Sequence, residues 1–202
     1  MGLCAGLALC LAAMPAQAAT VTQLNITSES VSLNFGPQLG TLAGTFNQPG
    51  QLIMGQFQPT PNIFSPVQLD SHLTFSIFSS SGQPVLNLLP PSGTTTGSTM
   101  TVDVSSLFAG LSSTQWGSWM TPATFGSLNI GGIATGSFNQ ATNAFNISWT
   151  HAFTGIPFLT SGTFSLQGTA LVAAVPLPAA ALLFGSGLLG LAGALRKKFN
   201  LA

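Results

Sequence analysis

Five side chains carry the carboxylates and imidazoles of this 202-residue chain: Glu29, Asp70, His72, Asp103 and His151. Asp70 and His72 lie two residues apart in an alternating segment, so a strand would place both on one face, about 7 Å apart. A Ser-His-Asp relay would need a hydroxyl from elsewhere, and the chain has no G-x-S-x-G motif to present one. We interpret the pair as a solvated strand face and keep a secreted hydrolase as a minor alternative.

The same residues offer little to a metal ion. His151 continues the face of Phe145, Ile147 and Trp149, which predicts a neutral imidazole at the rim of a core, bonded to a backbone carbonyl. Two histidines are too few for a zinc site without an additional Asp ligand, and three carboxylates isolated in sequence are too few for a calcium cage. Two carboxylates would suffice for a glycosidase, but only their number supports one. We predict no catalytic residue, metal or cofactor.

Two tryptophans suggest binding rather than catalysis. Trp116 and Trp119 lie in an irregular stretch, beside the polar side chains of Gln115 and Ser118. Exposed indole rings stack on sugars, whereas buried ones contribute a large apolar area to a core. Both interpretations stay open here, and the first makes Trp116 and Trp119 candidate carbohydrate-binding residues.

The distribution of charge excludes one class of function. The three basic residues are Arg196, Lys197 and Lys198, and residues 19–195 contain no Lys or Arg. Nucleic-acid binding needs cations to neutralise phosphates, so it is excluded. The lack of lysine also removes a common protection of exposed strand edges, which predicts weak self-association.

The elements that must position these residues are short strands. Apolar and polar residues alternate, and Gly, Pro, Asn and Ser mark turns between the segments. We predict an all-β fold, a single β-sandwich with a jelly roll as the alternative. The Thr/Ser-rich stretch 94–101 is interpreted as a solvated loop, with a site of surface glycosylation as the alternative. The predicted inward-facing residues of four segments are Val31, Leu33 and Phe35; Leu69, Leu73, Phe75 and Ile77; Met100, Val102 and Val104; and Phe164, Leu166 and Ala170.

The first 18 residues have the pattern of a signal peptide. Residues 3–13 are an apolar run, and Ala16 and Ala18 form the small-x-small site of signal peptidase, so the mature chain is expected to begin at Ala19. Both cysteines lie in this segment, which leaves the mature protein without a thiol. The predicted β-domain, residues 19–170, is long enough for one hydrophobic core.

The other end has the pattern of a membrane anchor. Residues 171–178 are a predicted linker, and residues 179–195 are an uncharged span that a helix would extend over roughly 25 Å. Arg196, Lys197 and Lys198 then form a basic stop in a tail, residues 196–202. The positive-inside rule places that tail in the cytoplasm.

This end resembles a known sorting signal. Val175, Pro176, Leu177, Pro178 and Ala179 precede the span and the basic stop, an arrangement similar to the PEP-CTERM signals of Gram-negative bacteria, in the variant with the motif Val-Pro-Leu-Pro-Ala. Leu177 stands where the parent motif has Glu. The resemblance implies recognition by an exosortase, cleavage near the motif, and release or transfer to the cell surface. It also implies a link to exopolysaccharide and biofilm matrix.

Together these patterns predict an exported, non-enzymatic protein of the cell surface or extracellular matrix that acts in adhesion or matrix assembly. A polysaccharide-binding module that uses exposed tryptophan is the alternative. The expected partners are signal peptidase, an exosortase, the inner membrane during or after export, and exopolysaccharide or a second copy of the chain.

Overall fold

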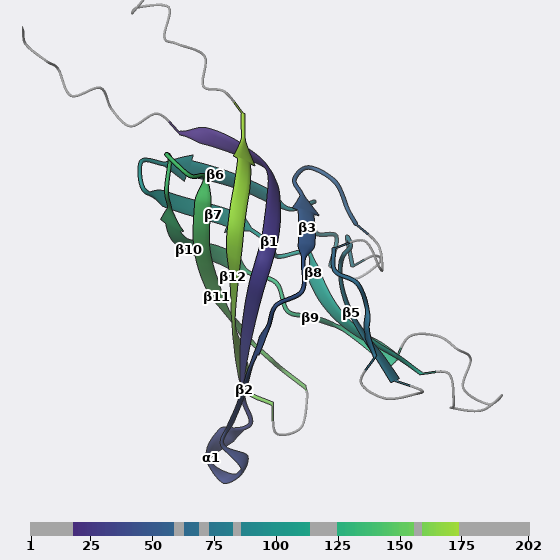
Figure 1. Cartoon of the computed structure of the whole chain (residues 1–202). Helices are drawn as coiled ribbons and strands as arrows, with labels where there is room; N and C mark the ends of the chain where they lie inside the picture. The colour runs from purple at the N-terminus through teal and green to yellow at the C-terminus, as the bar shows by residue number, and fades with distance from the viewer. Residues whose placement is uncertain are drawn as a thin grey trace, which may run out of the picture.

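The computed structural model describes residues 18–58, 63–68, 73–82, 86–113, 125–155 and 159–173, and nearly all of their regular structure is β (Figure 1). The all-β prediction is therefore confirmed. The elements in chain order are β1 (Ala19–Asn34), α1 (Gly36–Leu39), β2 (Thr41–Phe46), β3 (Gly50–Ile53), β4 (Val67–Gln68), β5 (Leu73–Ser79), β6 (Ser92–Thr96), β7 (Thr99–Asp103), β8 (Leu107–Ser113), β9 (Phe125–Asn129), β10 (Ile133–Phe138), β11 (Ala144–Ala152) and β12 (Ser161–Val172).

The larger sheet closes into a barrel. Its strands follow the order β12-β11-β10-β7-β6-β1, and β1 pairs again with β12. The beginning of β1 pairs with β6 while its other edge pairs with β12, so this long strand closes the ring. A register shift between Ile26 and Ser28 lets β1 bend as it does so. The predicted β-sandwich is wrong in this respect, because the large sheet closes on itself. Strands β4, β5, β8 and β9 form a separate small sheet.

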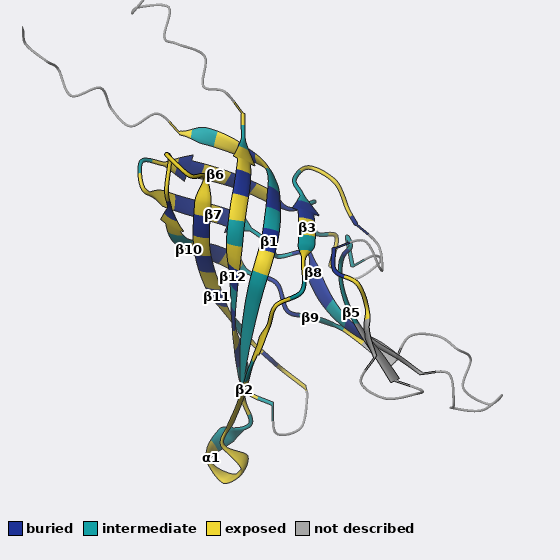
Figure 2. Ribbon diagram, in the orientation of Figure 1, coloured by how far each residue is buried: buried dark blue, intermediate teal, exposed yellow. Residues whose placement is uncertain are grey.

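The predicted alternation is confirmed in the barrel strands. On β11 the side chains of Phe145, Ile147 and Trp149 are buried, and the residues between them are exposed (Figure 2). On β7 and β12 the predicted inward-facing residues are buried too. A period of two residues places one set of side chains inside the barrel and the other in solvent, which explains the pattern.

The stretch 94–101 is not a loop. It contributes to strands β6 and β7, which pair in a hairpin whose turn includes Gly97 at φ 59°. The side chain of Thr95 is only 3% exposed. Threonine is β-branched and favours extended backbone, and this preference outweighs the polar composition that suggested a solvated loop.

Strand β1 continues beyond the barrel ring. Past its pairing with β6, the same edge pairs with β3 and then with β2. Beyond the register shift the residues of β1 that lie on the inner side of the sheet are Glu29, Val31 and Leu33, which pair with Leu166, Phe164 and Gly162 of β12. Figure 1 shows β1, β2 and β12 extending together from the barrel toward α1.

Gln58 joins the two sheets through its side chain and its backbone. Its Oε1 accepts a hydrogen bond from the Ile53 amide at 2.7 Å, and its Nε2 donates to the Gln51 carbonyl at 2.9 Å. The Gln58 backbone is bonded in turn to Ser79 on β5, through the Ser79 hydroxyl at 2.6 Å and the Ser79 amide at 2.9 Å. The side-chain amide of Gln58 therefore covers the edge of β3, and its backbone is hydrogen-bonded to β5 of the small sheet.

We expect Gln58→Ala to lower the free energy of unfolding by about 2 kcal/mol, because it removes a buried side chain and leaves a partly buried donor and acceptor of β3 without their partner. Urea unfolding followed by circular dichroism measures the change. Gln167→Ala, at an exposed position of β12, is the control and should change stability by less than about 0.5 kcal/mol. Equal effects of the two substitutions would contradict this role of Gln58.

Both ends of the folded unit lie at the same end of the barrel. Val21 pairs with Val172, and the Ala173 amide donates to the Thr20 carbonyl at 2.8 Å. Figure 1 shows the start of β1 beside the end of β12. Strand β12 includes Leu171 and Val172, so it continues two residues into the range predicted as a linker. In the described ranges no helix is long and apolar enough to cross a membrane. The predicted span, residues 179–195, lies outside them.

Candidate functional site

Several predicted site residues lie outside the described residues. They include Asp70 and His72, the candidate catalytic pair, and Trp116 and Trp119, the candidate sugar platform. They also include Ala16 of the signal-peptidase site and both parts of the sorting signal, which are Val175, Pro176, Leu177, Pro178 and Ala179, and Arg196, Lys197 and Lys198. Ala18 is described and exposed, and Ala19 is the first residue of β1. These assignments stay predictions.

His151 has the predicted environment. Its Nδ1 lies 2.7 Å from the Gly131 carbonyl oxygen, which can only accept, so Nδ1 carries the proton of this bond. The ring also lies against Phe153, with 4.9 Å between the centroids. The bond to a backbone carbonyl at the rim of the core is therefore confirmed. Within the described ranges no three His, Cys, Asp or Glu side chains are grouped to hold a metal ion.

The outer surface of the barrel carries a continuous row of hydroxyl groups. Strand registers place one threonine or serine from each of seven neighbouring strands side by side. Adjacent members are separated by the distance between paired strands, about 4.8 Å. Two of them, Ser30 and Ser165, are hydrogen-bonded at 2.6 Å between their hydroxyl oxygens. In order across the sheet, this hydroxyl row is Thr94, Thr101, Thr135, Ser148, Ser165, Ser30 and Thr45.

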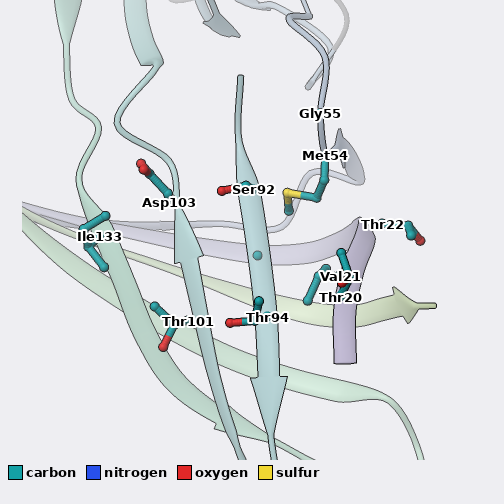
Figure 3. Close-up of a pocket in the computed structure, with 11 residues that line it drawn as sticks. Thr20, Val21, Thr22, Met54, Gly55, Ser92, Thr94, Thr101, Asp103 and Ile133 are labelled. Atoms are coloured by element: carbon teal, nitrogen blue, oxygen red, sulfur yellow. The ribbon is translucent and has the colours of Figure 1, made fainter. Parts of the chain in front are cut away.

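A groove of about 470 Å³ lies at one end of the hydroxyl row, over strands β1, β6, β7 and β10 (Figure 3). Thr94 and Thr101 of the row line it, and Ile133 and Met54 add aliphatic surface. Ile133 is 55% exposed, so its side chain is accessible to a ligand in the groove. Asp103 is the one carboxylate among the lining residues, and its Oδ1 accepts a hydrogen bond from the Ser105 amide at 2.9 Å.

The chemistry of this groove suits a neutral, hydroxyl-rich ligand. Threonine and serine hydroxyls both donate and accept, and Met54 and Ile133 offer a surface for the apolar face of a sugar ring. The groove could not be predicted from the sequence, because it depends on the pairing of β6 with both β7 and β1. The alternation through 93–96 and 99–103 around Gly97 was the available signal for the hairpin.

Glu29 lies on the inner side of β1, opposite Phe46 of β2 and Leu166 of β12. Burial raises the pKa of this carboxyl above its ordinary value of 4.5, and a hydrogen bond from the Gln48 backbone opposes part of that rise. Its Oε2 is buried and has no hydrogen-bond partner among the described residues. The protonated form is thus the better accommodated one.

This shift predicts the pH dependence of stability. A carboxyl whose pKa is higher in the folded than in the unfolded state binds more protons when the protein is folded. Its contribution to the free energy of unfolding therefore falls as the pH rises through 4.5 and beyond. We expect Glu29→Gln to be more stable than the wild type at pH 7 and to lose this part of the pH dependence. Urea unfolding at pH 4 and pH 7 tests both expectations. A lower stability of the variant at pH 7 would contradict them.

A scan of known protein families, of curated proteins and of solved structures finds no match to the chain. The resemblance of its C-terminal end to a sorting signal therefore stays a prediction.

Proposed function

We propose that the chain is an exported, non-enzymatic protein of the cell surface or extracellular matrix that acts in adhesion or matrix assembly. The observation that supports this most is where the folded unit begins and ends. Strand β1 begins at Ala19, the predicted first residue after signal-peptidase cleavage, and β12 ends at Val172, three residues before the predicted sorting motif. Removal of both ends would leave every described strand intact.

The surface of the barrel also supports an interaction protein. The hydroxyl row crosses seven strands, and no Lys or Arg occurs in residues 19–195. Such a surface offers many neutral hydrogen-bonding groups, which suits hydrated polymers better than charged ligands. The partners that this surface suggests are exopolysaccharide or further copies of the chain. During export, the proposed partners are signal peptidase and an exosortase.

The position of the two ends defines an orientation for the proposed precursor. Both the start of β1 and the end of β12 lie at one end of the barrel. A tail that holds this end at the inner membrane would direct the opposite end, with α1 and β2, away from the lipid. The hydroxyl row would face sideways along the barrel wall.

Substitution of the two prolines of the sorting motif tests the proposed route. We expect Pro176→Ala combined with Pro178→Ala to retain the protein in the membrane fraction of its own host, because the motif would no longer be cleaved. Quantitative immunoblots of membrane, cell-surface and medium fractions measure the distribution. Substitution of Gln56 and Gln140 by alanine, at exposed positions of the folded unit, is the matched control. Identical distributions of the two double variants would contradict sorting through this motif.

The groove favours a second candidate function, the binding of a neutral polysaccharide. We expect Ile133→Arg to weaken binding of the host's purified exopolysaccharide at least roughly tenfold by calorimetry, because it fills the groove with a charged side chain. Ser148→Arg, on the same outer surface beyond the groove, is the control and should have a smaller effect. Loss of binding only in Trp116→Ala or Trp119→Ala would place the site on the predicted tryptophans instead. No binding by the wild type would contradict this function altogether.

A further inference from the structure

Strand β2 has one free edge in the part of the chain that the structure describes. It pairs with β1 along its whole length, from Thr41 opposite Asn34 to Phe46 opposite Glu29, and with no other described strand. Its six residues are regularly paired, without a register shift. It contains no proline, no glycine at positive φ and no charged residue. It therefore lacks the usual features that prevent an edge strand from pairing with another chain.

The neighbouring strand β3 shows what a protected edge looks like in this protein. The Gln58 side chain bonds to the Gln51 carbonyl and the Ile53 amide, and a bridge between Gly50 and Phe64 covers the beginning of the strand. Strands β2 and β3 follow one another along the same edge of β1. One of them is capped by its own chain, and β2 is not capped by any described residue.

The backbone groups that β2 presents can be identified from the alternation of an antiparallel pair. The Phe35 amide donates to the Gly40 carbonyl at 2.9 Å, and the Asn34 carbonyl accepts from the Thr160 amide on the other side of β1. Asn34 and Thr41 therefore form a pair that does not exchange hydrogen bonds, and the next pair, Leu33 with Leu42, does. It follows that Thr41, Ala43 and Thr45 direct their amide and carbonyl groups to the free edge.

We propose that β2 is a self-association edge, which pairs antiparallel with β2 of a second copy about a two-fold axis through Ala43. In this register Ala43 meets its own equivalent, and Thr41 meets Thr45 of the second copy, which gives up to about six backbone hydrogen bonds. This assignment rests on the proposed function, because assembly of the matrix is where such pairing would be used.

The side chains of β2 fit this register. Leu42 and Phe46 are 65% and 42% exposed, which is a large apolar area for a strand surface. In the paired state Leu42 lies opposite Gly44 of the second copy, where no side chain obstructs it, and Phe46 is its diagonal neighbour. The equal absence of charge on both strands removes repulsion between the copies. The occupant that β2 fits best is thus β2 itself.

A single cysteine at the axis tests the pairing directly. The two Ala43 Cα atoms would lie about 5.5 Å apart, within the range that a disulfide spans. We expect the full-length Ala43→Cys chain, purified in detergent and oxidised, to give mainly disulfide-linked dimer on a non-reducing gel. Thr163→Cys is the matched control, because Thr163 is also exposed on the same outer surface but belongs to β12, which has a strand on each side. The wild type, whose cysteines Cys4 and Cys10 lie in the predicted signal peptide, is the second control.

A second pair of variants measures association without a new bond. Sedimentation equilibrium should show dimer for the wild type and for Thr163→Lys. Association of Ala43→Lys should be weaker by about tenfold or more, because the substitution places two ammonium groups at the axis. A strictly monomeric wild type, or equal cross-linking of Ala43→Cys and Thr163→Cys, would overturn the proposal. Neither result depends on export, so failure of the pairing stays distinguishable from failure of the proposed function.

Discussion

Replacement of Trp149 by alanine is expected to lower the free energy of unfolding by about 4 kcal/mol. The indole is 6% exposed and stacks on Phe164 of β12, with 5.4 Å between the ring centroids. Its Nε1 donates a 2.7 Å hydrogen bond to the Ile130 carbonyl, next to the glycine turn that leads into β10. The substitution removes the largest side chain of the barrel core and also leaves a buried carbonyl without its donor.

Trp149→Phe separates the two contributions. Phenylalanine keeps most of the ring contact with Phe164 and loses the hydrogen bond, so we expect a loss of about 1–2 kcal/mol. Urea unfolding followed by far-ultraviolet circular dichroism is the measurement. Asn146→Ala, at an exposed position of the same strand, is the control and should change stability by less than about 0.5 kcal/mol. A loss below about 1 kcal/mol in Trp149→Ala would show that the ring is not part of the core.

Gly136→Ala should be comparably severe for a different reason. A Cβ at Gly136 would overlap the Asn146 carbonyl oxygen and would lie 2.8 Å from the Ile147 Cα, both in the backbone of the neighbouring strand β11. Backbone atoms cannot turn away as a flexible side chain can, so β10 and β11 would have to separate. We expect a destabilisation of about 3 kcal/mol.

The chain contains its own control for this substitution. Gly44 begins the segment Gly-Thr-Phe-Asn-Gln, and Gly136 begins the closely similar Gly-Ser-Phe-Asn-Gln. A Cβ at Gly44 would meet only the ring of Phe46, at an ordinary 3.7 Å. Gly44→Ala should therefore change stability by less than about 1 kcal/mol in the same unfolding experiment. Similar losses at the two positions would show that the close approach of β10 and β11 is not responsible.

These two segments show how far the sequence could predict the fold. Local alternation correctly predicted that Ile147 and Trp149 face the core and that the chain is all β. It could not predict that Phe138 is buried while Phe46 is 42% exposed, since each is the third residue of the same motif. The difference arises because β10 has a strand on each side, whereas β2 lies at an edge.

Closure of the barrel could not be predicted from local sequence patterns either, because it also depends on which strands are neighbours. The ring depends on the pairing of β1 with β12, two strands from opposite ends of the folded unit, and on a register shift after Ile26 that lets β1 bend. Neither the partner of a strand nor its register is encoded in a period of two residues. A sandwich and a barrel therefore have the same sequence pattern, and only the pairing distinguishes them.

The candidate site also has one part that could be predicted from the sequence and one part that could not. The environment of His151 could be predicted, because its position on the face of Trp149 left a backbone carbonyl as the natural partner. The groove could not, because Thr94, Thr101 and Ile133 come together only through the registers of β6, β7 and β10. Because residues 94–101 are interpreted as a loop, most of β6 and the beginning of β7, two of the strands that form the groove, are not predicted.

The most direct test of the proposed function is the intact mass of the protein recovered separately from the membranes and the culture medium of its own host. We predict a species that begins at Ala19, the first residue of β1, and ends near Pro178 or Ala179, a few residues after the end of β12. A protein found only in the membrane fraction, with residues 196–202 still attached, would contradict release through the sorting motif. The tail would then be an anchor, and the proposed link to the extracellular matrix would lose its main support.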